Sequence, residues 1–280
     1  MQKRWRALKG LVFLLMAGAI GFPQSRGPKG TPLGTQRPEK SVEQPRENPP
    51  VVLEDLEVVI EKANQAHGGR KALASVVDSV STGNITFFTM HGPKSVASVT
   101  LIRKGSTQVQ RIVKQPHGEL RQGSDGKNDW ESFNGMSTTG NGYLVVNFIE
   151  SQTTRSLANF LDSKARGSTV RDAGSKNEMR VVEVEVPEKD SSKPARKTRY
   201  SVEKGSSRVT GVEWVTGETT TAFGTAIPTT EAYAFSDFRT VQGISTPFRI
   251  DRYVNGVKIE ETRLTSVRYN TSVKDDVFKP

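Results

Sequence analysis

The amino-acid sequence predicts an α+β fold that is mostly antiparallel β, built on one large curled sheet with helices on its concave face. About ten short segments rich in β-branched residues follow one another and are separated by turn residues. A helical hairpin near the N-terminus and one inserted helix are the only helical stretches. A sheet with this many strands cannot stay flat, so it curls and presents a concave face that has to be filled.

The helical hairpin is expected at the start of the folded region. In LEDLEVVIEKANQAHGG, an apolar stripe runs through Leu53, Leu56, Val59, Ile60 and Ala63, and Gly68-Gly69 supplies a C-terminal stop. The following RKALASVVDSV predicts a second, short helical element. A longer helix is expected over 143–167, where apolar residues recur at a period near 3.6.

The strands are expected on both sides of the inserted helix. Val182, Val184 and Val186 share one face of a strand, and Tyr233 and Phe235 share one face of another. The expected strands cover residues 83–90, 95–104, 107–115, 168–174, 177–188, 195–204, 207–217, 230–241, 243–254 and 256–270.

The last two strands form a hairpin around Asn255-Gly256. This dipeptide between two alternating segments predicts a type I′ turn, which fixes the register of the pair. Positive φ is expected at Gly256, so valine at this position is expected to destabilise the domain.

The N-terminal residues predict export. Residues 1–21 combine Lys3, Arg4, Arg6 and Lys9 with an apolar run and small residues, which is the pattern of a secretory signal peptide. An uncleaved membrane anchor is the alternative. Residues 22–52 follow as a Pro-rich tether, and one domain is expected over 53–280. A periplasmic or otherwise exported location follows.

Charge and residue content exclude several classes of function. The net charge is +10, but the positive residues are spread among acidic ones, which is unlike a nucleic-acid binder. Weak attraction to a membrane surface remains consistent with it. The chain has no cysteine, and its histidines, His67, His91 and His117, show no metal-ligand spacing. No catalytic constellation and no cofactor are expected.

Aromatic residues are the candidate functional set. A packed core accounts for most of them, and a ligand cavity between sheet and helices is the sharper interpretation. The candidates for a cavity lining are Phe87, Trp130, Phe133, Phe148, Phe160, Trp214, Phe235 and Phe248.

The C-terminal segment GISTPFRIDRYVNGVKIEETRLTSVRYNTSVKDDVFKP resembles the end of outer-membrane lipoprotein-sorting-protein-like chains, which share the LolA/LolB carrier fold. ANQAHGGRKALASVVDSVSTGNITF and SDGKNDWESF are also similar to that family, and the resemblance covers residues 53–280. It implies an incomplete, half-open β-barrel with helices on its open side and an apolar cavity between them. It also implies a lipid or acylated protein as the partner.

Three functions are weighed on this basis. The first is a non-enzymatic envelope protein that binds a lipid, an acyl chain or a lipid-modified partner. The second is a structural or interaction module with a filled core and an envelope protein as its partner. The third is a hydrolase acting on the cell wall or on lipid, which needs carboxylates or a histidine gathered inside the cavity.

Overall fold

The computed structural model describes residues 55–139, 160, 167–186, 196–220 and 226–280. These residues belong to a compact unit, Val52–Pro280. The predicted signal peptide and tether lie outside the described residues, and so does the predicted helix over 143–167, apart from Phe160 and Gly167.

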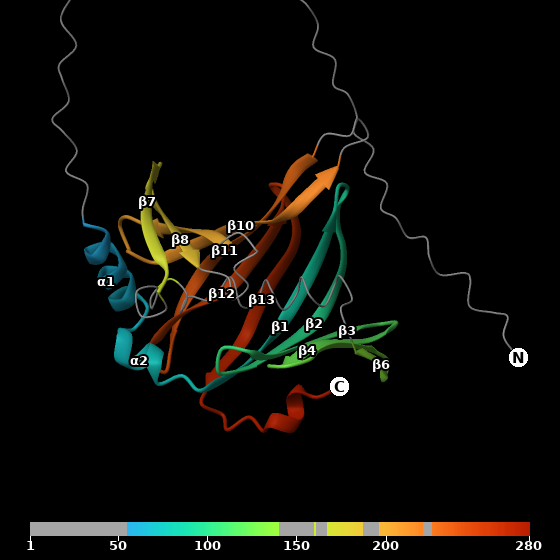
Figure 1. Cartoon of the computed structure of the whole chain (residues 1–280). Helices are drawn as coiled ribbons and strands as arrows, with labels where there is room; N and C mark the ends of the chain where they lie inside the picture. The colour runs from blue at the N-terminus through green and yellow to red at the C-terminus, as the bar shows by residue number, and fades with distance from the viewer. Residues whose placement is uncertain (1–54, 140–159, 161–166, 187–195, 221–225) are drawn as a thin grey trace, which may run out of the picture. The chain divides into compact units, whose positions relative to one another are not determined.

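Among the described residues, two helices precede the sheet. Helix α1 (Leu56–Ala66) begins at Asp55, whose side chain accepts a hydrogen bond of 3.0 Å from the Glu57 amide. Its apolar stripe, Val59, Ile60 and Ala63, is buried as the periodicity predicts. Helix α2 (Arg70–Ala74) follows after two glycines with positive φ. Together they make a sharp corner in the chain (Figure 1).

In the part of the chain that the structure describes, thirteen strands form one antiparallel sheet in the order β6-β5-β4-β3-β2-β1-β13-β12-β11-β10-β9-β8-β7. The first and last strands of the chain therefore pair in the middle of the sheet, and β6 and β7 are its two edges (Figure 1). The strands are β1 (Asp78–Thr89), β2 (Gly92–Lys104), β3 (Gln108–Gln115), β4 (Gly118–Asp125), β5 (Asp129–Phe133), β6 (Met136–Thr139), β7 (Thr169–Lys176), β8 (Met179–Val186), β9 (Arg196–Glu203), β10 (Val209–Thr220), β11 (Ala226–Val241), β12 (Ile244–Val254) and β13 (Val257–Tyr269).

The mostly antiparallel, unclosed sheet agrees with the sequence prediction, but the predicted number of strands is wrong. The three additional strands are β4, β5 and β6, between residues 118 and 139. Their segment has few β-branched residues, so propensity does not mark it. Within them, Gly123 on β4 pairs with Trp130 on β5, and a Cβ at Gly123 would lie only 2.7 Å from the Trp130 ring, so the close packing of this pair requires glycine.

One face of β8–β11 carries a filled core. Cross-strand partners Val182, Tyr200, Val212 and Tyr233 form a continuous row, and α1 packs on them. The Trp214 and Tyr233 rings stack with centroids 5.7 Å apart. We call this region the filled core; its buried members are Val59, Ile60, Ala63, Phe160, Val182, Val184, Tyr200, Val202, Val209, Val212, Trp214 and Tyr233.

The C-terminus covers the opposite face of β3–β5. The short 3₁₀ helix η1 (Asp275–Phe278) buries Phe278 completely. The indole Nε1 of Trp130 donates a 2.7 Å hydrogen bond to the Phe278 carbonyl, and the Gln110 side chain donates to the Val277 carbonyl. The chain end is thus fastened to the sheet.

The final hairpin turns at Asn255-Gly256, with φ of 49° and 77°. A type I′ turn requires positive φ at both positions. The Asn255 side chain also accepts a 2.8 Å hydrogen bond from the Thr230 amide, and its own amide donates to the Thr230 carbonyl. These bonds fasten the turn to β11.

Candidate functional site: an apolar cavity under the helical corner

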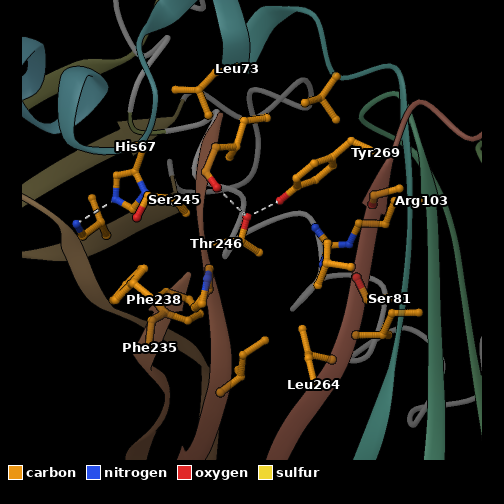
Figure 2. Close-up of a pocket in the computed structure, with 18 of the residues that line it drawn as sticks. His67, Leu73, Ser81, Arg103, Phe235, Phe238, Ser245, Thr246, Leu264 and Tyr269 are labelled. Atoms are coloured by element: carbon orange, nitrogen blue, oxygen red, sulfur yellow. Dashed lines mark hydrogen bonds between the residues drawn. The ribbon is translucent and has the colours of Figure 1, made fainter. Parts of the chain in front are cut away.

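A cavity of about 360 Å³ lies beside the filled core. Much of its wall is formed by β1, β2, β11, β12 and β13. The segment from α1 to the start of β1, residues 56–77, which we call the helical corner, contributes His67, Leu73 and Val76 (Figure 2). Most of the lining is aliphatic or aromatic. The cavity therefore spans the central β1–β13 pairing of the sheet.

Small residues on β1 leave the space open. Ser79 and Ser81 line the cavity where the filled core has tyrosine or tryptophan. Their partners on β13 are Tyr269 and Val267. Because these side chains are short, they leave space between β1 and the opposite lining residues.

His67 joins the helical corner to the sheet. Its Nε2 accepts a 3.0 Å hydrogen bond from the Val209 amide, so its Nδ1 carries the proton and donates to the Ser245 carbonyl at 3.2 Å. The ring also meets Phe238 edge-on at 5.8 Å. A Cβ at the next residue, Gly68, would lie 2.4 Å from the Gly243 carbonyl oxygen, so only glycine fits.

His67 is held in its neutral form. Burial lowers the pKa of His67 below its ordinary value, and the nearby positive charge of Arg208 lowers it further, against the opposing effect of the Ser245 carbonyl. At neutral pH the ring is therefore an uncharged link between helix and sheet. The described residues contain no group of three or more His, Asp or Glu side chains that could hold a metal ion.

Polar groups gather at one end of the cavity. The hydroxyl groups of Thr246 and Tyr269 lie 2.7 Å apart, and Arg103 extends toward them from β2 (Figure 2). Asp78 also lines this end. Its carboxylate accepts hydrogen bonds from the amide and hydroxyl of Thr271 and from the Val273 amide, at 2.7, 2.8 and 3.2 Å.

A charged network lies on the same face, beyond the apolar part. Arg252 pairs with Glu231 at 2.7 Å and with Glu260 at 3.2 Å, and Arg111 lies 3.7 Å from Glu260. Burial alone would lower the pKa of Arg252, but Tyr233, Glu260 and Glu231 raise it. The network borders a hollow of only about 20 Å³ that shares Leu101 and Ile250 with the cavity.

Of the aromatic residues predicted from the sequence, Phe235 lines the cavity. Trp214 and Phe160 lie in the filled core, and Phe87 packs on a neighbouring cluster around Ile85 and Val99. Phe248 is buried next to Leu264, under the Arg239 guanidinium at 4.3 Å.

Of the other three predicted residues, the two that the structure describes, Trp130 and Phe133, lie away from the cavity. Trp130 occupies the face under η1, because it shares a cross-strand row with Ile102, whereas the cavity residues Leu101 and Arg103 point to the other side. Phe133 is 47% exposed. Phe148 lies outside the described residues.

The sequence prediction missed the aliphatic and polar members of the lining. Ile244, Ile250, Leu264 and Val267 supply much of its apolar surface, and Arg103 and Tyr269 supply its polar end. Alternation along the predicted strands places Leu264 or Val267 on a buried face, but only the β1–β13 register shows that they meet Ser81 and its neighbours.

One unclosed antiparallel sheet with a helical corner against one face defines a LolA-like fold. A domain assigned as an outer membrane lipoprotein-sorting protein from Vibrio parahaemolyticus has a similar structure, with a TM-score of 0.51 and 13% identity over 80% of this chain and 97% of that one. A LolA superfamily protein from Nitrosomonas europaea aligns with a TM-score of 0.48 and 12% identity, over 80% and 97% of the two chains.

At these identities the likeness shows the fold alone. No protein-family model matches the chain, and no curated protein matches it. Among the described residues, no helix is long and apolar enough to span a membrane.

Proposed function

We propose that this chain is a non-enzymatic, exported envelope protein that binds a lipid, an acyl chain or a lipid-modified partner in the cavity. The observation that carries the proposal is the cavity itself, which lies between the sheet and the helical corner. Ligand pockets typically enclose about 300–1,000 Å³ and are lined mainly by apolar groups with few polar ones. The cavity, at about 360 Å³, has this size and character.

Two further features support a lipid as the ligand. The apolar lining residues Leu101, Ile250 and Leu264 come from three different strands, which suits a flexible chain in contact with several walls. The Vibrio structure of similar fold is described as a lipoprotein-sorting domain. The C-terminal residues 243–280 resemble outer-membrane lipoprotein-sorting-protein-like chains, and this resemblance points to the same class of ligand.

The N-terminal pattern supports the location. Residues 1–21 predict a cleaved signal peptide, and the Pro-rich residues 22–52 form a tether that precedes the domain. Cell fractionation and N-terminal sequencing of the mature chain test this part. An intact Met1 on the mature protein would contradict cleavage and favour an uncleaved anchor.

Binding is tested on the full-length protein purified from an exporting host. Solvent extraction and mass spectrometry identify co-purified lipid, and a fluorescent fatty-acid probe gives a titration curve. We expect saturable binding of one probe per chain.

A matched pair of variants locates the probe. Ser81→Leu places a larger side chain in the cavity, whereas Ser266→Leu makes the same change at an exposed position of β13. We expect Ser81→Leu to weaken binding by about tenfold or more, the loss of roughly 1.4 kcal/mol, and Ser266→Leu to bind like the wild type. Unaltered binding in Ser81→Leu, or no bound lipid and no saturation in the wild type, would overturn the proposal.

A structural or interaction module is the second candidate, because apolar side chains are exposed at two adjacent hairpins. Met90 is 69% and Val96 61% exposed near the β1–β2 turn, and Val257 is exposed just after the β12–β13 turn. An envelope protein that docks there would leave the cavity unused. The titration separates the two candidates, since a module without a ligand site does not bind the probe.

A further inference from the structure

The polar end of the cavity is built by one cross-strand row. Tyr269 on β13 pairs with Ser79 on β1, and Ser79 pairs with Arg103 on β2. Partners of this kind point to the same face and have Cβ atoms about 4.5–5.5 Å apart. All three residues line the cavity, so a guanidinium and two hydroxyl groups share one side of it.

The neighbouring rows are mostly apolar. The next row consists of Val267, Ser81 and Leu101, and Leu264 follows in the row after that. Phe235 and Ile250, which pair with one another on β11 and β12, extend the apolar surface. The cavity therefore has a polar end and an apolar length, which is the arrangement that an amphiphilic molecule requires.

In this structure the Tyr269 hydroxyl donates its hydrogen bond to the Thr246 hydroxyl. Thr246 donates its single hydroxyl proton to the Ile244 carbonyl at 3.1 Å, so the 2.7 Å contact with Tyr269 uses the phenol proton. Burial raises the pKa of Tyr269, against the opposing effects of Thr246 and the positive charge of Arg103, so the phenol is protonated at neutral pH.

Two other ionisable residues of the lining, His67 and Asp78, neither attract an anion in place of Arg103 nor repel it strongly. His67 is neutral, with both ring nitrogens bonded to the backbone of Val209 and Ser245. Burial alone would raise the pKa of Asp78, but its hydrogen bonds from Thr271 and Val273 outweigh that effect and lower the pKa. Its negative charge is therefore compensated by the chain segment after β13, which donates all three hydrogen bonds.

We propose that the ligand carries an anionic oxygen group, a carboxylate or a phosphate, which Arg103 binds, and that the Tyr269 hydroxyl turns its single proton from Thr246 to this group when the ligand is bound. The chain of the ligand extends from there along Leu264, Phe235 and Ile250. This inference rests on the proposed function and names the class of ligand within it. Arginine suits the role because its planar guanidinium forms paired, charge-assisted hydrogen bonds with carboxylate and phosphate groups.

The test compares three ligands of equal chain length on the full-length protein: dodecanoic acid, dodecanol and monododecyl phosphate. Displacement of a fluorescent probe gives each Kd. We expect at least one of the two anions to bind about tenfold or more tightly than the alcohol, as charge-assisted hydrogen bonds predict. The tighter of the two anions then identifies the source as a carboxylate or a phosphate group.

Variants assign the preference to Arg103. Arg103→Met retains the length of the side chain and removes the charge, and we expect it to bind acid and alcohol alike while the Kd of the alcohol is unchanged. Arg103→Lys is expected to restore part of the preference, and Tyr269→Phe to reduce it by a smaller factor. Arg268→Met, at an exposed position next to Tyr269, is the matched control and should behave as the wild type.

Unchanged binding of the alcohol shows that Arg103→Met retains its fold and its cavity. Equal binding of anions and alcohol by the wild type, or a preference that survives in Arg103→Met, would overturn the inference and leave the proposed function intact. If neither the anions nor the alcohol binds to the wild type, the proposed function fails as well.

Discussion

The filled core and the cavity lie on the same face of the same sheet, yet one is packed and the other is open. In the filled core, Tyr200, Trp214 and Tyr233 reach up to α1, whose Ala63 is fully buried against them. Over β1 the corresponding side chains are Ser79 and Ser81. The difference lies in side-chain size on particular strands, since the backbone architecture is continuous across both regions.

This contrast shows how one sheet provides both stability and a binding space. Tyr200 and Val209 belong to both regions, so the filled core forms one wall of the cavity. Close packing on that side holds the wall in place while the other side leaves the cavity open. Changes in the two regions should therefore affect different properties, and the following predictions test that separation.

The largest effect is expected from Trp214→Ala in the filled core. The ring is buried and stacks on Tyr233, so its removal leaves a cavity and should lower the free energy of unfolding by about 3–5 kcal/mol. Urea denaturation measures this. Trp214→Phe is the control, because the indole Nε1 forms no hydrogen bond within the described residues, so phenylalanine should cost far less. Equal losses in the two variants would mean that packing is not the cause.

A leucine introduced on each side gives the sharpest comparison. Ala63→Leu overpacks the filled core and should cost about 1–3 kcal/mol. Ser81→Leu places a side chain in the cavity and should leave the free energy of unfolding unchanged or raise it by up to about 2 kcal/mol. Denaturation curves and probe binding are measured on both. If Ser81→Leu destabilises the chain as much as Ala63→Leu does, the two regions do not differ as described.

A smaller effect is expected from Gly256→Val at the β12–β13 turn. Gly256 has a φ of 77°, which valine adopts only with strain of about 1–2 kcal/mol. We expect a lower Tm, measured by circular dichroism. Gly217→Ala on β10 is the control, because nothing lies within 4 Å of its Cβ position and no positive φ is required there. An unchanged Tm in Gly256→Val would contradict the expected type I′ turn.

The smallest effect is expected from pH. The folded state lowers the pKa of His67, so the unfolded chain binds more protons once the pH falls below about 6.5. Stability contributed by neutral His67 is therefore complete above that pH and is lost as the pH falls toward the folded-state pKa. Denaturation at pH 8, 6.5 and 5 measures it.

The control for pH is His91→Asn, which changes an exposed histidine and should retain the wild-type dependence. His67→Asn should lose the part of the dependence that lies between pH 5 and 6.5. If both variants behave as the wild type in that range, His67 does not link pH to the helical corner.

The regions of the fold that the sequence predicts well are those where local pattern and burial agree. The stripe Val59, Ile60 and Ala63 marks α1, and alternation marks the buried Val182 and Val184 on β8. In these elements each residue's propensity favours the structure that packing also favours. The first predicted helix and most strands therefore lie close to their observed positions. The second helical element, predicted over 70–80, ends at Ala74 instead, and residues from Asp78 onward belong to β1.

The three strands between 118 and 139 and the lining of the cavity depend on contacts between distant segments. Gly123 on β4 leaves room for the Trp130 ring, and the pattern of residues along the sequence does not reveal this contact. Large aromatic residues are natural candidates for a cavity, but they fill space, so Trp214 is found where no space remains. On β1 the lining includes the small residues Ser79 and Ser81, and only the register with β13 identifies them.

The pairing of β1 with β13 has a consequence for how the molecule assembles. Every other neighbouring pair of strands is consecutive in the sequence, whereas this one joins Ser79 to Tyr269 across almost the entire domain. Such non-local pairing is slow to form, so the two flanking groups of strands are expected to fold before they meet. The cavity straddles that junction and exists only once the C-terminal strand has arrived. A ligand held there would fasten the two groups together, and would raise the stability of the whole chain in proportion to its concentration and affinity.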